Sequence, residues 1–367
     1  MAKQRFYYLD NLRVFLTLLV ILHHIAIAYG GEGLHPYKDP NPDFWGSILF
    51  STFLALNQSF FMATFFFLSG FFVPGSLARK GPGHFLADRL LRLGVPIVCY
   101  SFLFVNVNRY ILDVWLRGNV FTPHWDLQVG HLWFLLALLL FNGGYALFRQ
   151  LWPVSPKVPG ERFPRRLHLW LAVVGLSLLT FGVRMYFPVG RTVLGMQPAH
   201  FVHYITAFTA GVLCRRENWL GHLTARQGVY WGRVVLCTVP WLAPLAAIAG
   251  MFQDSGAAQK LLGGFSLMAL SYAVWESILM VGINIWLLWF FHSKYNEVRR
   301  CMTWAAGNAF TVYIIHQTVL ICIHVLLHGL ALPATMKFFV AAILAIPLCF
   351  VLSVLIRRST LMRRILG

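Results

Sequence analysis

The chain has 367 residues, of which 58% are hydrophobic and 11% are charged. Typical soluble domains carry about 25% charged residues, so this composition excludes a soluble globular protein, a disordered chain, a coiled coil and a disulfide-stapled secreted module. The net charge of +18 comes without any nucleic-acid-binding motif, so no nucleic-acid partner is expected. The sequence predicts an all-α polytopic integral membrane protein, folded as a single domain over residues 1–367, with the lipid bilayer as its solvent.

Apolar segments long enough to cross a bilayer, which takes roughly 20 residues per helix, recur along the whole chain. The ten predicted spans are Leu12–Tyr29, Phe50–Val73, Leu93–Leu112, Leu132–Phe148, Leu167–Tyr186, Met196–Leu213, Val234–Phe252, Phe265–Phe291, Met302–Leu327 and Met336–Ile356. Polar residues interrupt the sixth of these, at Gln197, His200 and His203.

The positive charges between these spans indicate the orientation of the protein. With the N-terminus in the cytoplasm and the sides alternating, 22 of the 30 Lys and Arg residues fall in cytoplasmic segments. Arg13 lies at the start of the first span, and the 7 outer residues are Lys38, Arg109, Arg117, Arg184, Arg191, Lys260 and Lys337. Cytoplasmic loops of membrane proteins collect Lys and Arg, so this split predicts ten spans with the N- and C-termini both cytoplasmic.

The first span carries a stripe of polar side chains. A helix turns about 100° per residue, so Asp10, Arg13, Thr17 and His24 share one face if the helix begins by Asp10. His23 points about 100° away from that face. Ionisable groups inside a membrane are functional candidates by default. An arginine that reaches the interface and a histidine hydrogen-bonded between helices explain the pattern as well.

The ninth span is also rich in polar residues. Tyr313, Gln317, His324 and His328 follow the spacing of one helix face, and His316 precedes Gln317. The spacing of His324 and His328 is typical of metal ligands, but the sequence implies no third ligand, so no metal is expected.

Three further groups stand out along the chain. Glu276 lies deep in the eighth span, where pairing with an arginine explains it as well as a functional role does. His131 and Trp133 open the fourth span, at an outer interface where Trp is common in any case. Arg89 and Arg92 are spaced i, i+3 beside the membrane, which indicates either a phosphate clamp or ordinary cytoplasmic positive charge.

Several short blocks, in the same order, resemble the acyltransferase type 3 membrane family, and within it the glucans biosynthesis protein C branch, which is associated with succinyl transfer to periplasmic glucans. The blocks are Tyr8–Arg13 with His24 eleven residues after Arg13, Phe67–Gly70, Phe85–Pro96 with Arg89 and Arg92, His131–Leu135, and Tyr313–Gln317. Many members of the family follow the fourth block with an acidic pair, whereas here Ala137, Leu138 and Leu139 continue the apolar run. Any function that this acidic pair has in other family members is therefore not expected of this chain.

The resemblance implies an enzyme of the bacterial inner membrane that moves an acyl group from cytoplasmic acyl-CoA, either succinyl-CoA or acetyl-CoA, to a hydroxyl of an extracytoplasmic glucan or other carbohydrate. His24 would act as general base, because histidine is the usual base near neutral pH. The implied catalytic residues are His24, Asp10, Arg13 and His316. The implied acyl-CoA ligands are Arg13, Arg79, Arg89 and Arg92. The implied acceptor ligands are His131, Trp133, Gln317 and Glu276.

Two other functions fit the same composition. Helices with buried His, Glu and Arg suit a proton-coupled exporter of a glycan or small solute, although no internal repeat is visible. The histidines also suit a metal- or haem-binding membrane protein. The sequence leaves open whether the protein forms a homo-oligomer.

Overall fold

The computed structural model describes residues 5–153, 162–250 and 259–366, and within these residues it is helical, without a β-strand. Two of the 22 lysines and arginines counted as cytoplasmic, Lys3 and Lys157, lie outside the described residues, as do the last two residues of the predicted seventh span, Met251 and Phe252. The principal helices are α1 Tyr7–Ala28, α2 Phe44–Lys80, α3 Pro82–Arg89, α4 Val95–Cys99, α5 Val105–Tyr110, α6 Trp133–Leu151, α7 Arg166–Tyr186, α8 Phe201–Arg216, α9 Ala225–Thr238, α10 Leu242–Ala249, α11 Gln259–Leu262, α12 Leu267–Lys294, α13 Arg300–His328, α14 Ala334–Ile356 and α15 Thr360–Leu366. Helices α3, α4 and α5 are joined by π-helical turns into one helical segment, Pro82–Leu116.

The helices fall into two compact units. Unit 1 comprises residues 1–57, 86–140 and 297–367, and unit 2 comprises residues 58–85 and 141–296. Helix α2 contributes its first part to unit 1 and the rest to unit 2. The all-α polytopic fold predicted from composition is confirmed.

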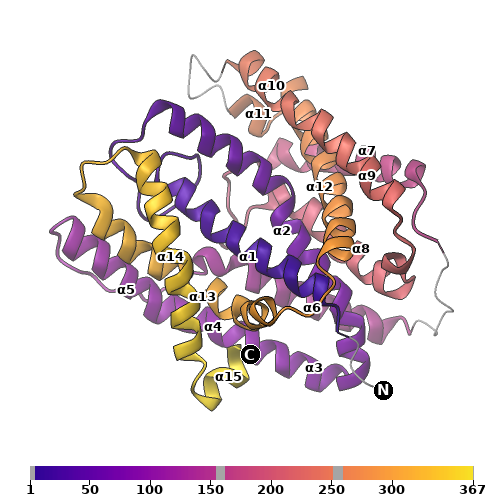
Figure 1. Cartoon of the computed structure of the whole chain (residues 1–367), viewed down its shortest axis with the longest axis horizontal. Helices are drawn as coiled ribbons and strands as arrows, with labels where there is room; N and C mark the ends of the chain where they lie inside the picture. Colours follow the sequence, from indigo (N-terminus) through magenta and orange to yellow (C-terminus); the bar gives the residue numbers. More distant parts are fainter. Residues whose placement is uncertain (1–4, 154–161, 251–258, 367) are drawn as a thin grey trace. The chain divides into compact units, whose positions relative to one another are not determined.

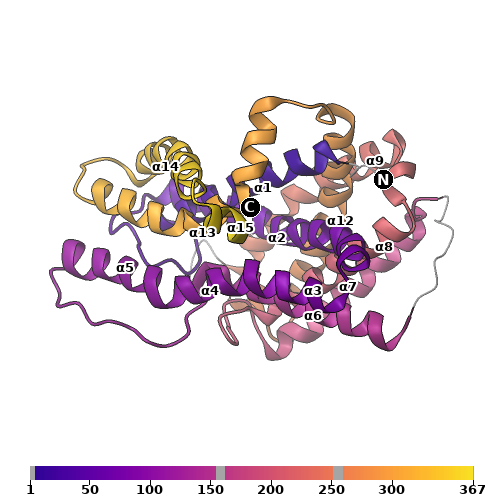
Figure 2. The same ribbon diagram turned by 90° about the horizontal axis from the view of Figure 1, so that it is seen from below.

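Unit 1 is built around α1, which packs against α13 and α14. Helices α13 and α14 lie side by side in both views (Figure 1 and Figure 2). Both helices bury apolar side chains: Leu9, Leu12 and Leu16 of α1 are completely buried, as are Val312 and Leu320 of α13. This packing fixes the axial position of α1 against α13, and with it the polar residues that the two helices carry.

Unit 2 is held together at α9 and α12 by glycines. A Cβ atom at Gly228 would collide with the Trp289 side chain, and a Cβ atom at Gly232 would come 2.7 Å from Trp286. These two glycines are spaced i, i+4 on α9, so they form a flat strip against the tryptophans of α12. Small residues at such contacts let helices approach closely, which compensates for the weak hydrophobic drive within lipid.

Close helix packing at glycines also explains the Phe67–Gly70 block, one of the blocks that carry the family resemblance. Gly70, the last residue of the Phe67–Gly70 block, lies on α2 where a Cβ atom would collide with the Phe208 carbonyl of α8. Gly211 of α8 faces the Phe67 carbonyl in the same way. This block therefore serves close packing of α2 on α8 in unit 2.

Within the described ranges, nine helices are long and apolar enough to cross a membrane. They correspond to nine of the ten predicted spans. The remaining one, Met196–Leu213, becomes a short 3₁₀ turn at Pro198–His200 followed by α8, which has 16 residues. A straight helix of that length rises about 24 Å, less than the roughly 30 Å hydrocarbon core. The orientation of every later loop depends on whether α8 crosses.

Thiol labelling on the two sides of α8 tests the predicted topology. Thr192 and Ala225 are exposed and precede and follow α8. In a protein whose native cysteines are replaced by serine, Thr192→Cys should react with an impermeant maleimide in intact cells, because the segment before α8 is predicted to face outwards. Ala225→Cys should react only after permeabilisation. Equal reactivity at both positions would show that α8 does not cross, and the reverse pattern would invert the predicted orientation.

Candidate functional site

Five histidines gather in unit 1. His24 comes from α1, His35 from the segment after α1, His131 from the turn before α6, and His316 and His324 from α13. The His24 ring lies 5.1 Å from the ring of His316, 6.0 Å from that of His35 and 6.4 Å from that of His131. His35 lies 5.4 Å from His324. The structure therefore brings together four residues singled out in the sequence, His24, His131, His316 and His324.

Two backbone carbonyls of α13 fix the tautomers of two of these histidines. His316 Nδ1 lies 2.6 Å from the Tyr313 carbonyl oxygen, and His131 Nε2 lies 3.1 Å from the Ile314 carbonyl oxygen. A carbonyl oxygen only accepts hydrogen bonds, so both of these ring nitrogens carry the hydrogen. In the neutral rings the opposite nitrogens, His316 Nε2 and His131 Nδ1, hold a lone pair. The Tyr313 hydroxyl donates to the His131 carbonyl at 2.5 Å, which ties the turn before α6 to α13.

His35 enters the cluster from the segment between α1 and α2. The Gln317 amide nitrogen donates to His35 Nε2 at 2.9 Å, and His35 Nδ1 lies 2.8 Å from the Tyr37 carbonyl oxygen. Burial, followed by the neighbouring His324 and His24, holds the pKa of His35 well below its usual 6.5, while Lys38 adds a smaller effect in the same direction. His35 is therefore a neutral ring at physiological pH, and Gln317, one of the predicted acceptor ligands, positions it.

Two tyrosines of the same segment enclose His324. The Tyr29 hydroxyl lies 3.0 Å from His324 Nδ1, and the Tyr37 ring stacks on His324 at 5.1 Å with an interplanar angle of 12°. Burial raises the pKa of both tyrosines above the usual value, so both hydroxyls stay protonated. The Tyr37 hydroxyl also lies 3.1 Å from His328 Nδ1. His324 and His328, which have the spacing of metal ligands in the sequence, are thus hydrogen-bonded to tyrosines.

A buried ion pair anchors this segment to α14. Lys337 Nζ lies 2.8 Å from Asp39 Oδ2, and both side chains are almost completely buried. Asp43, just before α2, accepts hydrogen bonds from the Thr335 hydroxyl at 2.6 Å and from the Gly46 amide, and the Thr335 bond in particular lowers the pKa of Asp43. The part of this segment that follows His35 is therefore fixed to the start of α14.

The arginine end of α1 forms its own polar group. Arg13 Nη1 donates to Asp10 Oδ1 at 3.3 Å, and Arg5 Nε donates to the other oxygen of Asp10 at 2.9 Å. The Thr17 hydroxyl donates to the Arg13 carbonyl. Arg13 keeps a third of its side-chain surface exposed, so its guanidinium is still accessible to a ligand. The neighbouring His23 bonds to another residue: its Nδ1 lies 3.1 Å from Asn57 Nδ2.

The predicted phosphate-binding arginines divide between the units. Arg89 and Arg92 belong to unit 1, where Arg92 Nε pairs with Asp88 at 3.3 Å. Arg79, at the end of α2, belongs to unit 2. Trp133, a predicted acceptor ligand of unit 1, packs edge-to-face against Phe134.

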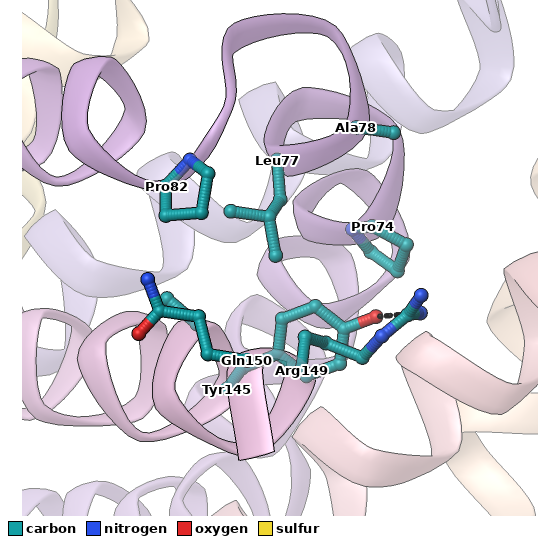
Figure 3. Close-up of a pocket in the computed structure, with 8 residues that line it drawn as sticks. Pro74, Leu77, Ala78, Pro82, Tyr145, Arg149 and Gln150 are labelled. Carbon is teal, nitrogen blue, oxygen red and sulfur yellow. Dashed lines mark hydrogen bonds between the residues drawn. The ribbon is translucent and has the colours of Figure 1, made fainter. Parts of the chain in front are cut away.

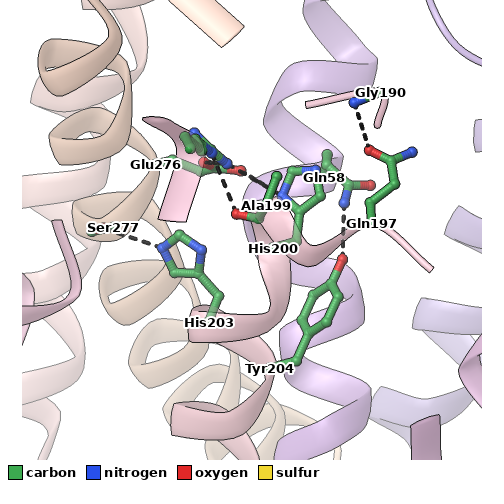
Figure 4. Close-up of polar contacts among 10 residues, drawn as sticks. Gln58, Gly190, Gln197, Ala199, His200, His203, Tyr204, Glu276 and Ser277 are labelled. Atoms are coloured by element: carbon green, nitrogen blue, oxygen red, sulfur yellow. Dashed lines mark hydrogen bonds and ion pairs between the residues drawn. The ribbon is translucent and has the colours of Figure 1, made fainter. Parts of the chain in front are cut away.

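Glu276, the remaining predicted acceptor ligand, lies in unit 2 in a network of its own (Figure 4). Its carboxylate accepts a 2.5 Å hydrogen bond from Arg184 and lies 3.4 Å from His200 Nδ1. Arg184, counted among the outer loop cations in the sequence, is completely buried. His203 extends the network to Ser277 at 3.1 Å. Glu276 is thus neutralised by an arginine, which is the structural alternative that the sequence left open.

A small cavity of unit 2 lies between the end of α2 and α6 (Figure 3). Its volume is about 200 Å³, and its lining includes Pro74, Leu77, Tyr145 and Arg149. Arg149 Nη1 donates to the Tyr145 hydroxyl at 3.4 Å. Sites for small molecules typically measure about 300–1,000 Å³, so this cavity is too small to enclose an acyl-CoA.

Sequence reasoning missed several members of the unit 1 cluster. His35 and Tyr37 lie outside every predicted span, so a search for polar residues within spans does not reach them. Lys337 was counted as an outer cation and is a partner of Asp39. The available signal is composition: the segment after α1 places His35, Tyr37 and Asp39 at alternate positions, which is unusual for a plain connecting loop.

Removing the cation of the buried pair tests how the cluster is held. Lys337→Met should lower the free energy of unfolding by about 3–5 kcal/mol, because it leaves Asp39 buried without a counter-charge. The double variant Asp39→Asn with Lys337→Met should recover much of that loss. Thermal unfolding in detergent, followed by tryptophan fluorescence, measures both variants. A single variant as stable as the wild type would show that water reaches this pair.

Comparison with known proteins agrees with the architecture. A family model described as an acyltransferase domain matches residues 6–358. The chain is 30% identical over 150 residues to glucans biosynthesis protein C of Escherichia coli strain 536, which covers 38% of this chain and 37% of the relative. It is 27% identical over 210 residues to the protein of that name from Salmonella typhi, with 53% and 51% covered, and 25% identical over 229 residues to that of Salmonella paratyphi A, with 57% and 58% covered. The matches thus span about a third to just over half of these curated relatives. Since the domain match extends over nearly the whole chain, the protein belongs to the acyltransferase type 3 family.

Proposed function

We propose that this multi-pass membrane protein transfers an acyl group, succinyl or acetyl, from cytoplasmic acyl-CoA to a hydroxyl of an extracytoplasmic glucan or related carbohydrate. The observation that carries the proposal is the composition of α1, which holds an accessible arginine at one end and a histidine of the buried cluster further along. The rise from Arg13 to His24 is roughly 16 Å, which separates an anion-binding end from a proton-accepting end along one helix.

His24 acts as the general base in this proposal. Its Nδ1 is buried and has no hydrogen-bond partner among the described residues, so it is not committed to another group. A ring nitrogen of His24 removes the proton of the acceptor hydroxyl while the oxygen attacks the thioester carbonyl. The C–O bond forms, the C–S bond breaks, and the imidazolium returns its proton to the departing CoA thiolate. Protons and electrons balance without a further reactant.

The other histidines assist by orientation. His316 Nε2 has a lone pair and no hydrogen in the tautomer set by the Tyr313 carbonyl, so it accepts a hydrogen bond and does not donate one to an oxyanion. We therefore assign His316 to accepting a hydrogen bond from a neighbouring hydroxyl of the acceptor sugar, with His131 and Gln317 beside it, so that the reacting hydroxyl keeps its only hydrogen for His24. For Trp133 and Glu276, a role in binding the acceptor rests on the family resemblance alone.

The donor end uses arginine chemistry. Guanidinium groups match phosphate geometry with two parallel hydrogen bonds, and Arg13, Arg89 and Arg92 of unit 1 supply them. The relatives named for glucan biosynthesis support a glucan acceptor. The proposal places the protein in the bacterial inner membrane, as the family resemblance implies, where cytoplasmic acyl-CoA and an outer acceptor would meet across one protein.

The two adjacent histidines of α1 provide a matched pair for testing the base. His24→Ala should reduce acyl transfer by about 10²- to 10⁴-fold and leave acyl-CoA binding intact, because a base acts on the hydroxyl proton alone. His23→Ala should retain most activity, since His23 bonds to Asn57. Transfer rates and acyl-CoA affinity are measured on equal amounts of folded protein. Activity in both variants would exclude histidine as the base, and loss in His23→Ala alone would place the base on the other face of α1.

The donor clamp has a matched control in the same unit. Arg92 pairs with Asp88 and Arg117 pairs with Asp113, both at i, i+4 spacing. Replacing Arg89 and Arg92 by Gln should weaken acyl-CoA binding by about 10- to 100-fold per arginine, since a hydrogen bond to a charged group contributes about 1.5–3 kcal/mol. Arg117→Gln, on the predicted outer side, should leave acyl-CoA binding unchanged. Equal acyl-CoA affinity in the wild type, the Arg89/Arg92 variant and the Arg117 variant would show that Arg89 and Arg92 serve only as cytoplasmic positive charges that set the topology.

A further inference from the structure

The histidine cluster of unit 1 presents hydrogen-bond acceptors in excess of donors. The carbonyls of α13 take the ring hydrogens of His131 and His316, so the buried His131 Nδ1 and His316 Nε2 face away from those carbonyls with lone pairs. The amide oxygen of Gln317 is a third buried acceptor, because its nitrogen donates to His35. None of these three atoms has a hydrogen-bond partner among the described residues.

Such atoms are rarely left alone in a folded protein. A buried polar atom without a partner destabilises the fold by about 1–3 kcal/mol, and most such atoms in native structures bond to protein, water or a ligand. Two of the three atoms belong to rings beside the candidate base: the ring of His131 lies 4.7 Å from that of His316, which lies 5.1 Å from that of His24. The third belongs to Gln317, whose amide nitrogen bonds to His35, a ring 6.0 Å from that of His24. A ligand that satisfies them must bring hydrogen-bond donors.

We propose, on the basis of the proposed function, that His131, His316 and Gln317 form a site for the hydroxyl groups of an uncharged sugar ring, and that this site rejects anionic sugars. A hydroxyl donates one hydrogen bond and so matches each lone pair. Carboxylate and phosphate oxygens have only lone pairs, so they are repelled by bare imidazole nitrogens and by an amide oxygen. His131, His316 and Gln317 would therefore both orient the sugar ring and select for a ring without negative charge.

A metal ion is the competing ligand, because neutral imidazole nitrogens bind transition metals. In the described part of the chain, no three His, Cys, Asp or Glu side chains are placed to hold one. Gln317 and the two carbonyl-fixed rings are instead arranged as single hydrogen-bond acceptors on the turn before α6 and on α13. A metal at this position is therefore an outcome that contradicts the proposal.

Binding without any acyl donor tests the proposal. The probes are a short neutral glucose oligosaccharide and the matched glucuronic acid oligosaccharide, titrated into the purified full-length protein in detergent. The wild type should bind the neutral probe at least about tenfold more tightly than the anionic one. His131→Phe and His316→Phe should each weaken binding of the neutral probe by about tenfold, since one hydrogen bond is lost and little volume changes. His292→Phe, an exposed histidine at the end of α12, is the matched control.

Deoxy sugars separate a direct contact from a packing effect. Oligosaccharides with one hydroxyl per ring replaced by hydrogen should bind the wild type about tenfold more weakly at the recognised position, and this loss should disappear in His316→Phe. His316→Gln, which keeps an acceptor oxygen, should recover part of the affinity if the Phe variant folds poorly.

Three results would overturn the proposal: failure of the wild type to bind the neutral probe, equal binding of the neutral and anionic probes, or stoichiometric Zn²⁺ binding that the same variants abolish. Because no acyl-CoA is present, the result is separate from the proposed function. A wild type that binds the neutral sugar through these residues but transfers no acyl group would reject the transferase proposal alone.

Discussion

A charged side chain placed among apolar helices is destabilising by several kcal/mol unless a partner neutralises it, and this constraint organises both units. In unit 1 it pairs Lys337 with Asp39 and thereby fixes the segment that carries His35. In unit 2 it pairs Arg184 with Glu276 and His200, which joins α7, the turn before α8 and α12. Imidazoles obey the same rule in a weaker form, because His131 and His316 each commit one ring nitrogen to a backbone carbonyl and keep a lone pair on the other.

The same constraint separates the two substrates proposed for the reaction. Anionic acyl-CoA requires cations, and the accessible Arg13 at one end of α1 supplies one. An uncharged hydroxyl requires acceptors, and the rings around His24 supply them at the other end. A single mixed site would place arginines next to the imidazoles, raise the energy of the imidazolium and weaken the base. Helix α1 avoids that conflict because it keeps Arg13 roughly 16 Å away from His24 along its axis.

Composition and positional pattern predict the helical membrane fold well, because a span is a local property of about 20 residues. The exception is α8, where polar residues at Gln197, His200 and His203 mark a turn and a short helix. The α1 stripe is also local, so Asp10, Arg13 and His24 were identifiable from spacing alone. The meeting of His24 with His131 and His316 depends on tertiary packing, which spacing does not encode. The partners of Glu276 and Lys337 were hidden for the same reason, and Gly70 proves to be a packing residue.

Helix α13 combines several of these features on one rigid element. It carries His316, Gln317 and His324, and it also supplies the two carbonyls that fix the rings of His131 and His316. A change in the position of α13 would therefore move these side chains and, at the same time, the carbonyls that set the tautomers of His131 and His316. An exchange of α13 between family members would therefore transfer His316, Gln317 and the carbonyl that orients His131 in a single graft, while His131 itself stays on the turn before α6. The catalytic histidine and the arginine of α1 stay behind in such a graft, so the chemistry and the choice of acceptor can diverge independently.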